Sequence, residues 1–98
     1  LNFLFAVSKT KSVIHLMGMV RSSKERGHNV KIFFNEDSVR LLAQYPILSD
    51  LEVEMLACQT TCKFMNINEE DLIRNAKMTS LAELVMLMES MDRTLFLG

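Results

Sequence analysis

The sequence predicts a three-layer α/β/α fold on a five-stranded, mostly parallel sheet, in a single domain over residues 1–98. Short apolar runs of strand length alternate along the chain with segments whose apolar residues recur at helical spacing. This alternation is typical of a parallel sheet with helices on both faces. The composition agrees, because 98 residues with 49% apolar and 23% charged side chains suit one globular core.

The chain opens with a strand and a helix. Residues 2–7 form a continuous apolar run, which suits a strand buried on both faces. A polar loop over residues 8–12 follows. Residues 13–26 then carry apolar side chains at helical spacing, and Gly27 fits the left-handed position that ends many helices.

The next elements are a strand, a short helix and another strand. Residues 30–34 are apolar enough for a second strand. We expect Asp37 or Ser38 to cap the short helix, because both side chains accept hydrogen bonds from free backbone N–H groups. Pro46 should end that helix, and residues 51–58 should form the third strand.

Shorter elements follow the third strand. The sequence predicts a short helix over residues 60–65, with Asn66 in the left-handed conformation. Residues 68–74 have acidic side chains at their start and suit one further helical turn. Residues 75–78 are expected to form a short fourth strand.

The last helix has the clearest local signal. Ser80 and Glu83 match a capping box, in which each side chain accepts from the other residue's backbone N–H. Residues 94–97 should form the final strand. The side chains expected to face the core are Leu81, Leu84, Val85, Met88 and Met91, and those expected outside this stripe are Ala82, Met86 and Leu87.

The additional apolar surface of this helix predicts self-association. A small domain with apolar side chains on a second helix face buries them against a copy of itself or leaves them exposed. Several of the eight methionines lie in such segments, and methionine suits adaptable contact surfaces. We therefore expect a homo-oligomer.

Charge and composition argue against several classes of protein. The net charge is −1 and the lysines and arginines are scattered, so we expect no nucleic-acid partner. No apolar run approaches the length of a membrane span, and we expect no membrane partner. Two cysteines four residues apart do not form a disulfide framework, which favours the reducing cytoplasm.

Cys58 is the strongest candidate for chemistry. It ends the apolar run of the third strand and precedes a predicted helix. The unpaired N–H groups and the dipole at a helix start favour an anion, and the thiolate is the reactive form of cysteine. Carboxyl ends of parallel strands share one edge, where the crevice of such folds lies. The side chains expected around the thiolate are Lys9, Thr10, Gln59, Thr60 and Thr61.

The second cysteine and the histidines leave other interpretations open. Cys62 lies about one helical turn after Cys58 and either resolves an oxidised Cys58 or packs inside the helix. A zinc site would need His15 or His28 with both cysteines, but the histidines lack paired spacing. We expect no metal and no other cofactor.

The third strand, its terminal cysteine and the tail of the chain together resemble the DsrE/DsrF-like family of sulfur-relay proteins. The matching pieces are residues 55–61, 65–67, 70–73, 77–84 and 91–96. The family's strand-terminal cysteine falls on Cys58. The resemblance implies a persulfide carrier that works with protein donors and acceptors of sulfur, and it implies trimers or hexamers.

The sequence is compatible with three functions. The leading prediction is a sulfur carrier or sulfurtransferase subunit that holds a persulfide on Cys58. Its rival is a non-catalytic interaction or ligand-binding subunit with the same fold, in which both cysteines are structural. A dithiol redox protein ranks third, because three residues separate Cys58 from Cys62 while thioredoxin-type motifs have two.

Overall fold

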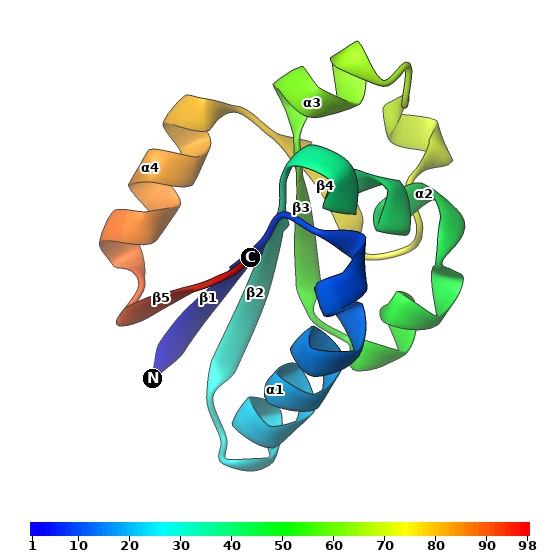
Figure 1. Ribbon diagram of the computed structural model, residues 1–98. Helices are drawn as coiled ribbons and strands as arrows, with labels where there is room; N and C mark the ends of the chain where they lie inside the picture. The colour runs from blue at the N-terminus through cyan, green and yellow to red at the C-terminus, as the bar shows by residue number, and fades with distance from the viewer.

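The computed structural model describes residues 1–98 and has one sheet of five strands, all parallel, in the order β4-β3-β2-β1-β5 (Figure 1). The predicted α/β class and the largely parallel sheet are confirmed. The strands are β1 (Asn2–Val7), β2 (Asn29–Phe34), β3 (Glu54–Cys58), β4 (Ala76–Thr79) and β5 (Arg93–Leu97).

Four α-helices and four 3₁₀ turns connect the strands. The helices are α1 (Val13–Glu25), α2 (Leu41–Gln44), α3 (Gln59–Phe64) and α4 (Leu81–Ser90). The 3₁₀ turns are η1 (Thr10–Ser12), η2 (Glu36–Arg40), η3 (Pro46–Leu51) and η4 (Glu69–Asp71). Figure 1 shows α4 on one side of the sheet, and α1, α2 and α3 on the other.

The two faces of the sheet are buried to different extents. One face contributes to a core of 17 buried residues, in which Phe5, Ile32 and Met55 pack against the side chains of α1, α2 and α3. On the other face the buried apolar side chains are Leu4, Phe33 and Leu56, and α4 covers them. The fold therefore has three layers, and most of the core lies between the sheet and the layer of α1, α2 and α3.

Helix α4 differs from its predicted orientation. Leu84, Leu87, Met88 and Met91 pack against the sheet, whereas Leu81 and Val85 are exposed. The prediction was wrong for Leu81 and Val85, which were expected to face the core, and for Leu87, which was expected outside. The contacting set keeps the helical spacing, but its centre is rotated toward Leu87 and Met91.

Local hydrogen bonding explains two further differences. Asn35, not Asp37 or Ser38, caps η2, since its Oδ1 accepts from the Glu36 backbone N–H at 2.8 Å. The Ser38 hydroxyl completes a capping box by accepting from the Asn35 backbone N–H at 3.1 Å, and it also donates to the Val7 carbonyl at 2.8 Å. The third strand begins later than expected, because Glu52 has a left-handed backbone (φ 52°) that separates η3 from β3.

The other predicted caps are confirmed. Gly27 has φ 82° and Asn66 has φ 58°, so both adopt the left-handed conformation expected after a helix. The Ser80 Oγ accepts from the Glu83 N–H at 3.1 Å, and Glu83 Oε1 accepts from the Ser80 N–H at 3.0 Å. This capping box fixes the first turn of α4.

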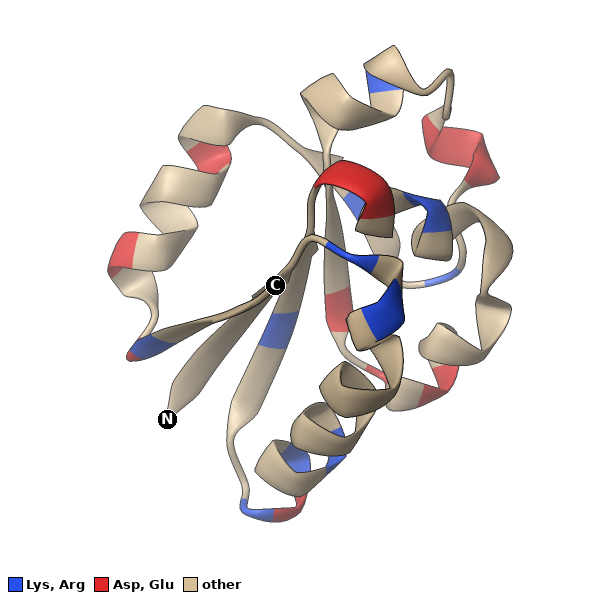
Figure 2. Ribbon diagram, in the orientation of Figure 1, with Lys and Arg blue, Asp and Glu red and all other residues tan.

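Charges of both signs are distributed over the whole chain, as Figure 2 shows. One cluster lies on the α4 side of the sheet: the Glu54 carboxylate on β3 lies 3.5 Å from Lys31 Nζ on β2 and 3.3 Å from Lys77 Nζ on β4. None of the helices has the length and apolar character needed to cross a membrane.

Candidate functional site

The segments that follow β1, β2 and β3 meet at the carboxyl edge of the sheet. The Ser38 backbone N–H donates to the Ser8 carbonyl at 3.0 Å, which joins the loop after β1 to the turn after β2. Thr61 Oγ1 donates to Asn35 Oδ1 at 3.2 Å, which joins α3 to the end of β2. The predicted assembly of this edge therefore exists, and hydrogen bonds hold it together.

Cys58 occupies the end of β3 and the N-cap position of α3. Its backbone is extended (φ −60°, ψ 116°), and no side-chain hydrogen bond caps the helix. The residue is half-buried and packs against the cluster of Leu4, Phe33 and Leu56. Its partner on β4 is Thr79, directly before the Ser80 cap of α4. The thiol thus lies where three elements meet and is partly open to solvent.

Cys62 lies on the opposite face of the sheet from Cys58. It is fully buried in the large core, whereas Cys58 contacts the small cluster beneath α4. Burial raises the pKa of the Cys62 thiol, and a negative charge on Cys58 raises it further. A thiol with a raised pKa is seldom ionised, so this environment favours the packing role over the resolving role.

The five residues expected around the thiolate fall into two groups. Gln59, Thr60 and Thr61 directly follow Cys58 as the first turn of α3. Lys9 and Thr10 follow β1, and strand β2 separates them from β3. Thr10 Oγ1 donates to Asp37 Oδ2 at 3.2 Å, so the turn after β2 stands between the two groups.

An apolar cavity of about 150 Å³ lies at the same edge, between α4 and the sheet. Sequence reasoning missed it. Side chains that alternate along a strand share one face, and this pattern could have indicated the cavity. Leu4 and Ala6 on β1 share the face of their β5 partners, Thr94 and Phe96. The residues that line the cavity are Leu4, Ala6, Val7, Ser8, Phe33, Asn35, Leu84, Met88, Thr94 and Phe96.

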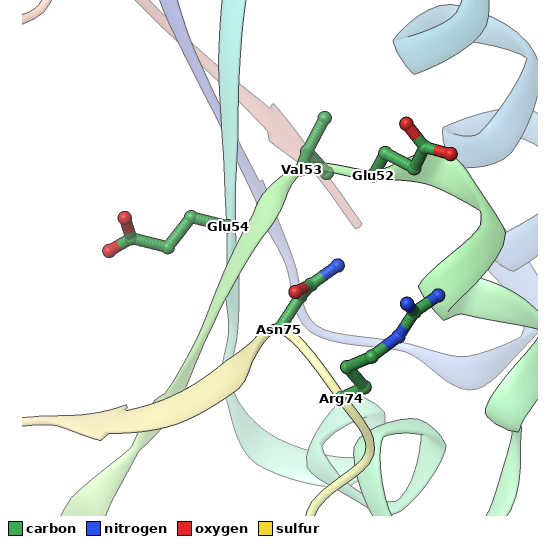
Figure 3. A pocket seen from close by; sticks show the side chains of 5 residues that line it. All are labelled: Glu52, Val53, Glu54, Arg74 and Asn75. Atoms are coloured by element: carbon green, nitrogen blue, oxygen red, sulfur yellow. The ribbon is translucent and has the colours of Figure 1, made fainter.

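A second depression, of about 480 Å³, lies at the opposite edge, where β3 and β4 begin. Figure 3 shows that the Glu54 side chain points away from those of Glu52, Arg74 and Asn75, so the charged groups do not converge. His28 is also at this edge, 3.3 Å from the N-terminal amine. Nowhere do three or more His, Cys, Asp or Glu side chains come together in an arrangement that could hold a metal ion.

Comparisons with known proteins agree with this architecture. The family model described as DsrE/DsrF-like matches residues 2–97. The crystal structure of the YchN protein from E. coli is similar with a TM-score of 0.82 and 17% identity, over 98% of this chain and 98% of that one.

A second solved structure is MTH1491 from Methanobacterium thermoautotrophicum, described as a protein of unknown function. It is similar with a TM-score of 0.80 and 16% identity, over 94% of this chain and 96% of that one. At these identities the two structures show a shared fold. No curated protein matches the chain.

Proposed function

Because the chain belongs to the DsrE/DsrF-like family, we propose that it is a sulfur carrier, or a sulfurtransferase subunit, that holds a persulfide on Cys58. The observation that carries this proposal is the position of Cys58. It ends a central strand at the carboxyl edge, it is partly open to solvent, and a helix starts at the next residue.

The proposed transfer has two balanced steps. The Cys58 thiolate attacks the outer sulfur of a donor persulfide, R–S–SH. The donor S–S bond breaks, R–S⁻ leaves, and Cys58 becomes a persulfide. An acceptor thiolate then attacks the outer sulfur of Cys58–S–SH, which transfers that sulfur and restores the Cys58 thiolate. Each step exchanges one S–S bond for another and needs no external oxidant.

The partners in this proposal are proteins that donate and accept sulfane sulfur, in the reducing cytoplasm, where thiols persist. Self-association is part of the proposal. Two side chains of α4 and one of β5 support it, since Leu81 is 74% exposed, Met86 71% and Phe96 72%. An exposed apolar surface of this kind is stabilised by burial against another chain, and we propose a trimer or hexamer.

Mass spectrometry after incubation with inorganic polysulfide tests the carrier proposal. We expect the folded wild-type protein to gain about 32 Da, one sulfur atom, on Cys58. Cys58→Ser should abolish this adduct and Cys62→Ala should retain it. An adduct that persists in Cys58→Ser, or a folded protein that gains no sulfur, would contradict the proposal.

The rival function is a non-catalytic interaction or ligand-binding subunit with structural cysteines. The packing of Cys58 against the small apolar cluster is the observation that favours it, because a buried cysteine behaves as a small apolar side chain. This reading predicts that Cys58→Ala keeps binding and assembly intact, and that polysulfide adds no sulfur to the native chain.

A further inference from the structure

The cavity beneath α4 is bordered by three strands and one helix and is partly open to solvent. Its walls come from β1 (Leu4, Ala6), β2 (Phe33), β5 (Thr94, Phe96) and α4, together with the residues that follow β1 and β2. Leu4 and Phe33 also belong to the cluster against which Cys58 packs. The cavity and the thiol therefore border the same two side chains.

The size and lining of the cavity define what fits. Seven of the ten lining residues are apolar, and none carries a charge. A cavity of about 150 Å³ accommodates a molecule of the size of benzene. A charged ligand would lose its hydration there without gaining a counter-ion.

The lining has three polar side chains, Ser8, Asn35 and Thr94, and hydrogen bonds to other parts of the protein fix one of them, Asn35. Asn35 Oδ1 accepts from the Glu36 N–H at 2.8 Å and from Thr61 Oγ1 at 3.2 Å. These contacts fix the orientation of the amide, which leaves its Nδ2 as the donor that it can offer to a ligand. The lining thus suits an uncharged, mainly apolar molecule, to which the Asn35 amide and the Ser8 and Thr94 hydroxyls can offer hydrogen bonds.

Access to the cavity needs no change in the sheet. In the single chain, Met88 is partly exposed and Phe96 is 72% exposed, so two wall side chains reach solvent. In the assembly proposed above Phe96 is covered, and Met88 is the wall side chain through which a ligand enters. Leu81 lies three residues before Leu84 and Val85 lies three residues before Met88 on the helix, and both Leu81 and Val85 are exposed. Apolar surface therefore continues from the wall of the cavity onto the outside of α4.

We propose that this cavity is a binding site for a small, uncharged, apolar molecule of about the size of benzene. The site is separate from the sulfur chemistry proposed for Cys58, since none of its lining residues is a cysteine.

Titration of protein labelled at its methionine methyl groups with benzene tests the site by NMR. The Met88 methyl lines the cavity, and the exposed Met86 methyl on the same helix does not, so Met86 is an internal control. We expect a saturable shift of Met88 within the aqueous solubility of benzene, and no such shift with benzoate. A non-saturating response, an equal shift of Met86, or equal binding of benzoate would overturn the proposal.

Two variants change the volume of the cavity in opposite directions. Ala6→Leu adds three carbon atoms to the wall and should abolish the Met88 response. Leu84→Ala removes three and should allow the larger indole to bind, so the proposal stays testable even if Ala6→Leu does not fold. Saturable binding by folded Ala6→Leu, or no indole binding by Leu84→Ala, would contradict it. Cys58→Ser should bind benzene like the wild type, which separates a failure of this site from a failure of the carrier proposal.

Discussion

Thr61 Oγ1 donates a 3.2 Å hydrogen bond to Asn35 Oδ1, and this bond ties the helix that follows Cys58 to the end of the neighbouring strand. Asn35 also caps η2 through the same oxygen atom. The first turn of α3 is thus held from outside its own segment, although Cys58 itself provides no side-chain cap.

Replacement of Thr61 by valine should loosen this attachment. Thr61→Val keeps the branched shape but removes the donor, so we expect the free energy of unfolding to fall by about 1 kcal/mol. Cys58 should also react faster with iodoacetamide in the native state, because α3 is less firmly held. Thr60→Val is the matched control, since Thr60 is exposed and makes no such bond. Equal effects of both substitutions would contradict this role for Thr61.

Cys62 should act through packing. Its thiol is fully buried in the large core, so Cys62→Ala should lower the free energy of unfolding by about 1–2 kcal/mol. The lifetime of a persulfide on Cys58 should not change, which mass spectrometry at successive times measures. A longer lifetime in Cys62→Ala, or an intramolecular disulfide formed in mild oxidant, would instead establish Cys62 as a resolving thiol.

The capping box of α4 should make stability depend on pH in the acid range. The bond from the Ser80 backbone N–H is the main cause that lowers the pKa of Glu83, and the Ser80 side chain adds to it. A carboxylate with a lowered pKa in the folded state contributes stability above its unfolded pKa. That contribution is lost as the pH falls through the folded value.

Glu83→Gln should therefore flatten the acid part of the stability curve. The glutamine oxygen can still accept from the Ser80 N–H, but it does not titrate. Glu89→Gln on the same helix is the control, because Glu89 is exposed and forms no capping contact. Urea unfolding at a series of pH values measures the effect, and identical curves for wild type and Glu83→Gln would disprove it.

Self-association should depend on the outer surface of α4. We expect the wild-type chain to sediment as an assembly larger than a dimer at tens of micromolar, the range where obligate assemblies persist. Met86→Asp should weaken this assembly, since Met86 is apolar and 71% exposed, and the substitution places a charge on the surface proposed to be buried. Met86→Leu should preserve it. A wild-type monomer at these concentrations would contradict the prediction of self-association.

The sequence predicts features that depend on neighbouring residues better than features that depend on distant ones. Ser80 and Glu83 satisfy each other within four residues, and Gly27 and Asn66 adopt φ values that few other residue types favour, so their roles were predictable. Asn35 was missed as a cap. Its neighbour Ser38 is an equally good cap in isolation, and only the folded sheet brings the Val7 carbonyl to the Ser38 hydroxyl.

The arrangement of the site depended on contacts that no local pattern contains. Cys58 was predicted at the sheet edge because an apolar strand ends there. Cys62 was left with two roles, because the turn from β3 into α3 decides which face of the sheet each thiol approaches. The inner face of α4 was predicted incorrectly for a related reason. Apolar side chains lie on more than one face of α4, and the position of the sheet selects the face that is buried.

Strand order has a consequence for synthesis of the protein. β1, made first, lies between β2 and β5, and β5 is the last strand of the sheet to be made. One side of β1 must therefore keep its backbone N–H and C=O groups without strand partners until Arg93–Leu97 have left the ribosome. Unpaired edges of apolar strands promote aggregation. We expect nascent chains that stall before β5 to need chaperones more than the finished chain does.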